Sequence, residues 1–213
     1  KYDGYFETIK KFGDKLVGKN RTVEESPTKG NPTAEAAKSL GVPVQVLDDY
    51  HSDDSLEKIR NGNADLGIVF GTNIIKESVF GIPRLGSINL HQGLAPFYRG
   101  GPPVFWELFN DEKEVGLTVH FVASKVDTGD IVLQKTVPLA YDFGYGDDFQ
   151  AFIDDYRLEL RKDCAEMVAE AAAMIASGEF PRIAQDTTLG KRYRLPIKSE
   201  KDEMRRRLAR RKA

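Results

Sequence analysis

One stretch near the middle of the chain limits its structure and chemistry most, because it ends an apolar strand with two polar side chains. Residues 87–90 have the pattern of a short buried strand, and Asn89 and His91 fall at its C-terminal end. Side chains alternate along a strand, so residues two apart point to the same side. An amide and an imidazole are therefore expected to face the same space.

A loop rich in glycine and proline follows this strand, over residues 92–103. Such residues break regular structure, and α/β proteins place ligand sites where a strand gives way to a loop of this kind. Asp127 lies further on, in a tight turn between the strand-like segments 115–122 and 131–137. A carboxylate that approaches an imidazole and an amide suggests proton transfer combined with polarisation of a carbonyl group.

Three motifs resemble those of a known family and follow one another in the same order. They are Asn89-x-His91, the segment Pro96–Pro103 with its Arg99-Gly100, and Asp127-x-Gly129-Asp130. Together they are similar to the formyltransferases that use 10-formyltetrahydrofolate, a group that includes methionyl-tRNA, glycinamide ribonucleotide and sugar N-formyltransferases. The likeness runs over roughly residues 31–134, so it covers the middle of the chain.

The resemblance implies roles for the three polar residues. Asn89 would donate a hydrogen bond to the formyl oxygen as that oxygen gains charge. His91 would handle the proton and, once protonated, support the oxyanion, because imidazole titrates near neutral pH. Asp127 would orient His91 and help to remove the proton from the attacking amine.

The resemblance also implies binding residues. The loop after the apolar run 66–70 would hold the pterin ring of the folate, through Asn73, Ile74 and Ile75, with 10-formyltetrahydrofolate as the formyl donor and no metal. Arg99 would pair with an anionic part of the substrate. The sequence departs from the family at Gly93, where many members carry a serine.

Alternating short strands and helices predict an α/β fold, a mostly parallel twisted sheet flanked by helices as in Rossmann-like formyltransferases, with a short C-terminal helical extension. We expect a catalytic domain over residues 1–183 and the extension, ending in a basic helix, over 184–213. The expected elements include a helix over 33–40, a strand over 44–47, a helix from Ser52 to about residue 61 and one long helix over 149–177.

The first strand of the family's fold is not evident, and residues 5–16 have helical spacing instead. Truncation of the chain, missing residues and divergence are the three explanations that the sequence leaves open.

Composition narrows the partners and the location. The net charge of −2 gives no general bias toward nucleic acid or membrane, and a single cysteine excludes an internal disulfide. We expect a cytoplasmic protein without a membrane or nucleic-acid partner, acting on a small-molecule amine and able to form a homodimer through an exposed edge.

The leading interpretation is transfer of a formyl group to an amino sugar. The most specific version of this interpretation is an amino sugar linked to a nucleotide. The segment Tyr98-Arg99-Gly100 favours the tRNA and sugar branches, and the short tail disfavours the tRNA branch. Alternatives are a methionyl-tRNA formyltransferase-like enzyme, a 10-formyltetrahydrofolate hydrolase, and a non-catalytic folate-binding or partner-binding domain. A dinucleotide-dependent oxidoreductase is less favoured, because no G-x-G-x-x-G follows a first strand.

Overall fold

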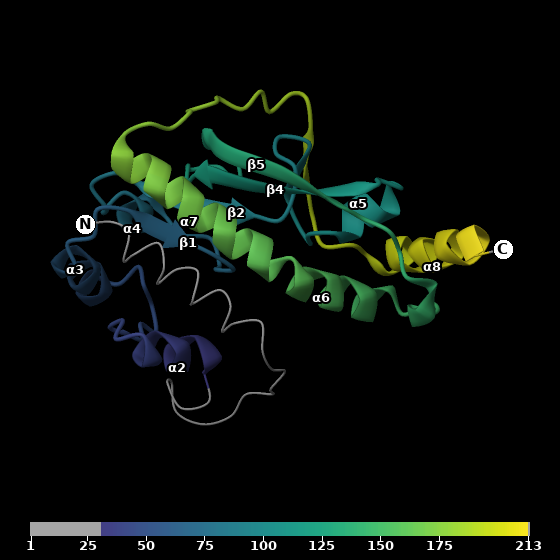
Figure 1. The fold of residues 1–213 in the computed structure, drawn as a ribbon, viewed down its shortest axis with the longest axis horizontal. Coiled ribbons are helices and arrows are strands. Elements are labelled where there is room, and N and C mark those ends of the chain that lie inside the picture. Colours follow the sequence, from purple (N-terminus) through teal and green to yellow (C-terminus); the bar gives the residue numbers. More distant parts are fainter. Residues whose placement is uncertain (1–30, 213) are drawn as a thin grey trace. The chain divides into compact units, whose positions relative to one another are not determined.

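The computed structural model describes residues 31–212, and the helical spacing expected over residues 5–16 lies outside this range. The chain divides into two compact units, drawn in Figure 1. The first contains the described residues up to Ser87 together with Glu159–Phe180, and the second contains Ile88–Leu158 and the chain from Pro181 onward.

The described part of the first unit is built from helices and a short strand. Asn31 accepts hydrogen bonds from the N–H groups of Thr33 and Ala34 and so caps the first helix, and Ser52 caps the next. Gly178 follows the helix over Arg161–Ser177 and ends it in the left-handed backbone conformation, which glycine adopts more readily than other residues. The elements are α2 (Pro32–Ser39), α3 (Asp53–Asn61), β1 (Gly67–Val69), α4 (Glu77–Phe80) and α7 (Arg161–Ser177).

The two helices expected in this unit are confirmed, and one expected strand is absent. The helices predicted over 33–40 and from Ser52 are α2 and α3. The strand predicted over 44–47 is not formed, since these residues lie in irregular, mostly exposed chain. The apolar run 66–70 contains β1, in which Ile68 is 44% exposed.

The long helix predicted over 149–177 is divided into α6 (Phe149–Glu159) and α7. Leu160 stands between them, buried and with backbone angles close to helical, and its carbonyl accepts the N–H of Cys164. The apolar spacing continues through Leu160, which explains why the sequence pattern does not reveal this break.

The second unit contains the long strands. Strand β2 (Ser87–His91) pairs with β4 (Glu114–Phe121), which pairs with β5 (Ile131–Pro138), and Figure 1 shows β4 and β5 side by side. Both pairings are antiparallel, unlike the mostly parallel arrangement expected for the sheet. The α/β class itself is confirmed, because helices accompany the strands. For β4 and β5 the physical reason is the short link over residues 122–130, because parallel strands need a crossover of about a dozen residues or more.

Strand β3 (Tyr98–Gly100) runs parallel to β6 (Lys191–Tyr193), and helix α5 (Phe105–Phe109) follows β3 in the chain. Gly100 has a φ of 77°, and an added Cβ would lie 2.5 Å from the carbonyl oxygen of Tyr193, so this pairing requires glycine. A single 3₁₀ turn, η1 (Phe143–Tyr145), precedes α6.

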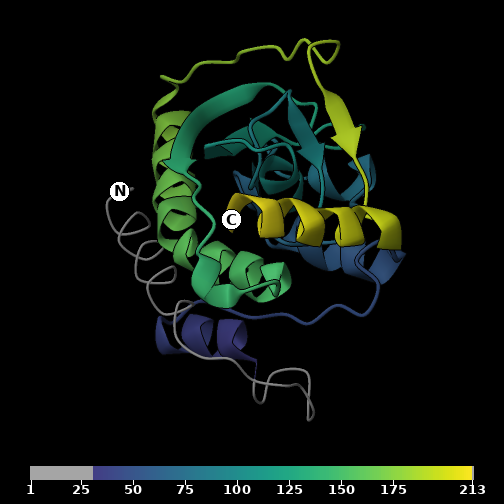
Figure 2. The same cartoon turned by 90° about the vertical axis from the view of Figure 1, so that its right-hand side faces the viewer.

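The basic helix predicted at the C-terminus is α8 (Lys198–Lys212), seen in Figure 2 as the yellow helix that ends at the C label. It buries Met204 and Leu208. Arg207 donates to the carbonyl of Phe109 at 2.8 Å, which satisfies a group at the C-terminal end of α5. The residues from 184 onward thus contact β3 and α5, and a separate extension beginning there stays a prediction.

Candidate active site

Strands β2 and β4 bring three polar side chains together. Asn89 and His91 are two apart on β2, and the register places His120 of β4 directly opposite Asn89. Side chains directly opposite one another in an antiparallel pair point to the same face. The amide nitrogen Nδ2 of Asn89 lies 3.3 Å from Nε2 of His120. The alternation predicted from the sequence is therefore present in the structure.

Asp127 reaches this face from the link between β4 and β5. Its backbone has a φ of 53°, which is uncommon for a residue with a side chain. Its Oδ2 accepts the N–H of Gly100 at 2.8 Å and lies 3.5 Å from Nδ1 of His91, while Oδ1 lies 3.4 Å from Nε2 of His120. The carboxylate therefore stands between two imidazoles.

Gly129 explains why this link can turn so tightly beside Asp127. A Cβ added at Gly129 would overlap the carbonyl oxygen of Phe121, the last residue of β4. In the Asp127-x-Gly129 pattern, Asp127 therefore supplies the carboxylate and Gly129 meets a requirement of the backbone for a residue without a side chain.

The electrostatics of Asp127 favour the charged carboxylate. Burial acts to raise its pKa, but the hydrogen bond from His120, the electrostatic interaction with the His91 imidazole and the N–H of Gly100 outweigh burial and hold the pKa below its usual value. The group is therefore ionised at neutral pH.

His91 is held by two contacts of different kinds. Its Nε2 lies 2.7 Å from the carbonyl oxygen of Tyr98, and because a carbonyl only accepts, Nε2 carries a proton. Burial lowers the pKa of His91 below 6.5, although the charge of Asp127 and the carbonyl of Tyr98 act in the opposite direction. The imidazole is thus neutral near pH 7, with its unprotonated Nδ1 facing a carboxylate.

His120 also belongs to this cluster, although it was not among the site residues predicted from the sequence. It is 2% exposed, and its Nδ1 lies 2.8 Å from the carbonyl oxygen of Phe121. Its Nε2 lies 3.3 Å from Nδ2 of Asn89 and 3.4 Å from Oδ1 of Asp127. The signal available in the sequence was a histidine inside an apolar strand, just before the turn that carries Asp127. We name Asn89, His91, His120 and Asp127 the polar cluster.

The residues predicted to hold the pterin lie in the first unit, in the loop between β1 and α4. Asn73 and Ile74 are exposed and Ile75 is half-buried. The loop is fixed at its end by His51, whose Nε2 accepts the N–H of Lys76 at 3.1 Å.

Arg99 lies on β3 and is only 9% exposed. Its Nε donates to the carbonyl of Pro96 at 3.1 Å, and its Nη2 donates to the carbonyl of Thr187 at 3.2 Å. The bond to Thr187 ties β3 to the segment that precedes β6. The pairing of Arg99 with an anionic substrate stays a prediction.

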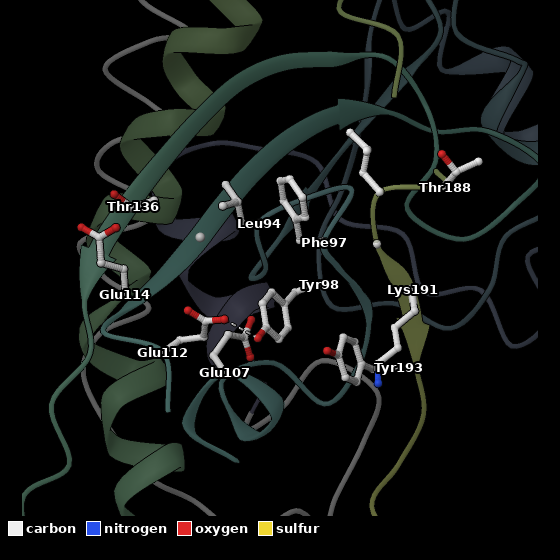
Figure 3. Close-up of a pocket in the computed structure, with 13 residues that line it drawn as sticks. Leu94, Phe97, Tyr98, Glu107, Glu112, Glu114, Thr136, Thr188, Lys191 and Tyr193 are labelled. Carbon is white, nitrogen blue, oxygen red and sulfur yellow. Dashed lines mark hydrogen bonds between the residues drawn. The ribbon is translucent and has the colours of Figure 1, made fainter. Parts of the chain in front are cut away.

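A cavity of about 510 Å³ lies in the second unit, beside the loop that follows β2. Its walls combine three carboxylates with aromatic rings, a lysine and hydroxyl groups, and Figure 3 shows most of these side chains: Phe97, Tyr98, Glu107, Glu112, Glu114, Thr136, Thr188, Lys191 and Tyr193. Tyr98 and Glu107 also border a small hollow that is lined by His91. The cavity and the polar cluster thus share a boundary.

Within residues 31–212, no group of three or more histidine, cysteine, aspartate or glutamate side chains is arranged to hold a metal ion. None of the helices described there is long and apolar enough to cross a membrane.

Comparison with known protein families identifies the region that carries the polar cluster. Residues 15–148 match the family model described as formyl transferase. A methionyl-tRNA formyltransferase of Azobacteroides pseudotrichonymphae is 33% identical over 179 residues, which cover 84% of this chain and 52% of the relative. One from Parabacteroides distasonis is 32% identical, covering 81% of this chain and 50% of the relative. The chain thus spans about half the length of these relatives.

Solved structures show the same fold. A glycinamide ribonucleotide transformylase of Symbiobacterium toebii superposes with a TM-score of 0.60 at 24% identity, covering 73% of this chain and 75% of that one. A sugar N-formyltransferase of Shewanella sp. gives 0.58 at 19%, covering 95% and 82%. The formyltransferase PseJ of Anoxybacillus kamchatkensis, in complex with UDP-4,6-dideoxy-4-formamido-L-AltNAc and tetrahydrofolate, gives 0.51 at 25%, covering 71% and 72%.

Proposed function

Because the chain belongs to the formyl transferase family, we propose that it transfers a formyl group from 10-formyltetrahydrofolate to a primary amine. The observation that carries this proposal is the polar cluster. The cluster combines an amide donor, imidazoles and an ionised carboxylate on one face of β2 and β4. Asn89 contacts His120, and Asp127 lies within ion-pair distance of both His120 and the neutral His91. A domain that only binds folate has no need of all three.

In the proposed reaction the amine attacks the formyl carbon, and a C–N bond forms while the C=O π electrons move to oxygen. The Nδ2 group of Asn89 donates to this oxygen as it becomes negative, which stabilises the tetrahedral intermediate. Asn89 is positioned for this by its contact with His120.

The proton released by the amine passes to the pair formed by His91 and Asp127. Nδ1 of His91 is unprotonated and lies 3.5 Å from Oδ2 of Asp127, so a proton taken up there is stabilised by the carboxylate. The imidazolium formed in this way supports the oxyanion. The bond from carbon to N10 of the folate then breaks, N10 takes the proton, and tetrahydrofolate leaves with the formamide as the other product.

The folate would bind through the loop that contains Asn73, Ile74 and Ile75. A pterin has flat apolar faces and an edge of donors and acceptors, which suits exposed isoleucines and backbone groups. Ile74 is 69% exposed, and a surface of this kind gains stability when a ring covers it. PseJ, which was solved with tetrahydrofolate, supports the choice of donor.

For the acceptor we propose an amino sugar. The sugar N-formyltransferases among the structural neighbours support this choice, while the methionyl-tRNA formyltransferases among the relatives support the alternative of a tRNA acceptor. Water as acceptor would make the protein a hydrolase with the same cluster. The homodimer and the cytoplasmic location stay predictions.

The test is release of tetrahydrofolate from 10-formyltetrahydrofolate with a panel of amino sugars, nucleotide-linked amino sugars and initiator methionyl-tRNA. Wild type is measured beside His91→Ala and Asp127→Ala, with formate assayed in every reaction. Turnover with an amine that both variants lose supports the transferase and identifies its acceptor. Formate release without an acceptor indicates the hydrolase, and folate binding without any turnover contradicts the proposed activity.

A further inference from the structure

The cavity of about 510 Å³, which we name the acidic cavity, has an excess of negatively charged side chains that the proposed reaction at the polar cluster does not require. Glu107, Glu112 and Glu114 line it, against a single lining lysine, Lys191. Glu107 is 2% exposed and has no ion-pair partner among the residues described. Its carboxylate accepts the backbone N–H groups of Glu107 itself and of Val104, and burial together with the charge of Glu112 raises its pKa to about 7. A buried carboxylate of this kind is stabilised by a cation.

The aromatic wall of the same cavity also favours a cation. The rings of Tyr98 and Tyr193 stack with centroids 5.1 Å apart at an angle of 4°. Nζ of Lys191 lies 4.6 Å from the centroid of Tyr193. An ammonium group of the chain itself therefore already stands against this wall, which is the geometry in which aromatic faces attract cations.

The wall is held in place by a hydrogen-bond network. Nδ2 of Asn110 lies 3.0 Å from the hydroxyl of Tyr98 and 3.1 Å from that of Tyr193. The hydroxyl of Tyr98 donates to Oε1 of Glu112 at 2.7 Å, the dashed line in Figure 3. Figure 3 also shows Glu107 and Glu112 reaching toward the same place beside the ring of Tyr98. The carboxylates and the rings thus form one preorganised surface.

We propose that this cavity binds a positively charged part of the amine acceptor, separate from the amine that is formylated. The identification of the bound cation as part of the acceptor rests on the proposed function. It is supported by the boundary that the cavity shares with the polar cluster. Tyr98 lines the cavity with its side chain and accepts the hydrogen bond of His91 with its carbonyl. The same carboxylates repel phosphate, so the diphosphate of a nucleotide-linked acceptor would not occupy this cavity.

The test measures binding to the full chain without folate, so that it does not depend on turnover. Trp106 is the one tryptophan of the sequence, and its ring centroid lies 5.2 Å from that of Tyr193, so its fluorescence reports on the cavity wall. The probes are spermidine, glucosamine, glucose and glucose 6-phosphate. Titration calorimetry gives the dissociation constants independently.

The variants are the double substitution Glu112→Gln with Glu114→Gln, and the single charge reversal Glu114→Lys, since both residues are exposed and tolerate polar replacements. Glu170→Gln is the matched control, because Glu170 is an exposed glutamate of α7 that does not line the cavity. Circular dichroism confirms that each variant is folded.

We expect spermidine to bind most tightly and glucose 6-phosphate most weakly. The double variant should bind spermidine about tenfold more weakly, because two solvent-exposed charge pairs are lost, while Glu170→Gln matches wild type. Unchanged spermidine binding in the double variant and in Glu114→Lys would overturn the proposal, as would tighter binding of glucose 6-phosphate. If the protein binds cations but transfers no formyl group, the cavity is still a cation-binding site, but its occupant is not a formyl acceptor.

Discussion

The polar cluster and the acidic cavity lie in the same unit and share Tyr98 as a boundary, yet they are built differently. In the cluster, four side chains are fixed by contacts of 3.3 to 3.5 Å with one another and by shorter bonds to backbone groups. The cavity presents carboxylates around about 510 Å³ of open space. The first arrangement fixes the position of protons, whereas the second selects charge.

Burial acts on both regions and pushes each toward neutrality, with opposite consequences for pH dependence. It lowers the pKa of His91 and raises that of Glu107 to about 7, because the charged form is disfavoured in each case. A base therefore becomes easier to deprotonate and an acid harder to ionise. The two regions can be separated experimentally by the sign of their titration.

The largest effect is expected from Asp127→Asn. The asparagine retains an oxygen that accepts the N–H of Gly100, but it lacks the charge that stabilises a protonated His91. We expect the rate of the chemical step to fall by about 10³-fold, within the range for loss of acid–base catalysis. Single-turnover kinetics measure this rate, with Asp130→Asn as the matched control in the same link. A fall of less than about twofold would be incompatible with the proposed role.

The second effect concerns the cavity and the stability of the fold. Because the pKa of Glu107 is 4.5 in the unfolded chain and about 7 in the folded one, the native state binds an extra proton between these values. Stability contributed by this group therefore decreases as pH rises through that window, by roughly 3 kcal/mol. Glu107→Gln should remove this loss, which denaturant unfolding near pH 5 and near pH 8 would measure. An unchanged pH profile would contradict the assignment.

A smaller effect is expected from Gly93→Ala, which tests how closely the cluster is packed. An added methyl group would overlap Nε2 of His91 and lie 2.5 Å from the carbonyl oxygen of Tyr98, so the imidazole must move. We expect the transfer rate to fall on the order of tenfold and the free energy of unfolding to fall by about 1–3 kcal/mol. Gly101→Ala is the control in the same loop, since its methyl group would meet no atom closer than 3.3 Å. Equal rates for the two variants would refute this packing argument.

The smallest effect is the titration of His91 itself. Its pKa is lowered on folding, so below pH 6.5 the unfolded state binds a proton that the native state does not. The native state therefore loses stability as pH falls through 6.5, opposite in direction to the contribution of Glu107. In a Glu107→Gln background, His91→Gln should reduce this loss, as measured by melting temperature against pH. The idea fails if both proteins lose stability equally on acidification.

The sequence predicted the cluster well where local geometry decides the outcome. Alternation along β2 was enough to place Asn89 and His91 on one face, and the turn pattern identified Asp127. His120 was not predicted, because nothing near a histidine in an apolar strand indicates which residue it will contact. Its role depends on the register between β2 and β4, which pairs it with Asn89.

Other parts of the fold depend on contacts between distant segments and could not be predicted. The break at Leu160 lies within a continuous apolar spacing, and the pairing of β2 with β4 joins segments that are far apart in the sequence. Glu107 has the sequence context of a solvent-facing helical residue. Its burial follows from the packing of α5, and the acidic cavity was missed for the same reason.

The most direct test of the central claim follows an isotopically labelled formyl group from 10-formyltetrahydrofolate into the product by mass spectrometry. An amine that is a substrate for wild type is incubated with wild type, Asp127→Asn and Asp130→Asn. The account predicts labelled formamide from wild type and Asp130→Asn and almost none from Asp127→Asn. Equal labelling by all three proteins would contradict the claim that the polar cluster carries out the transfer.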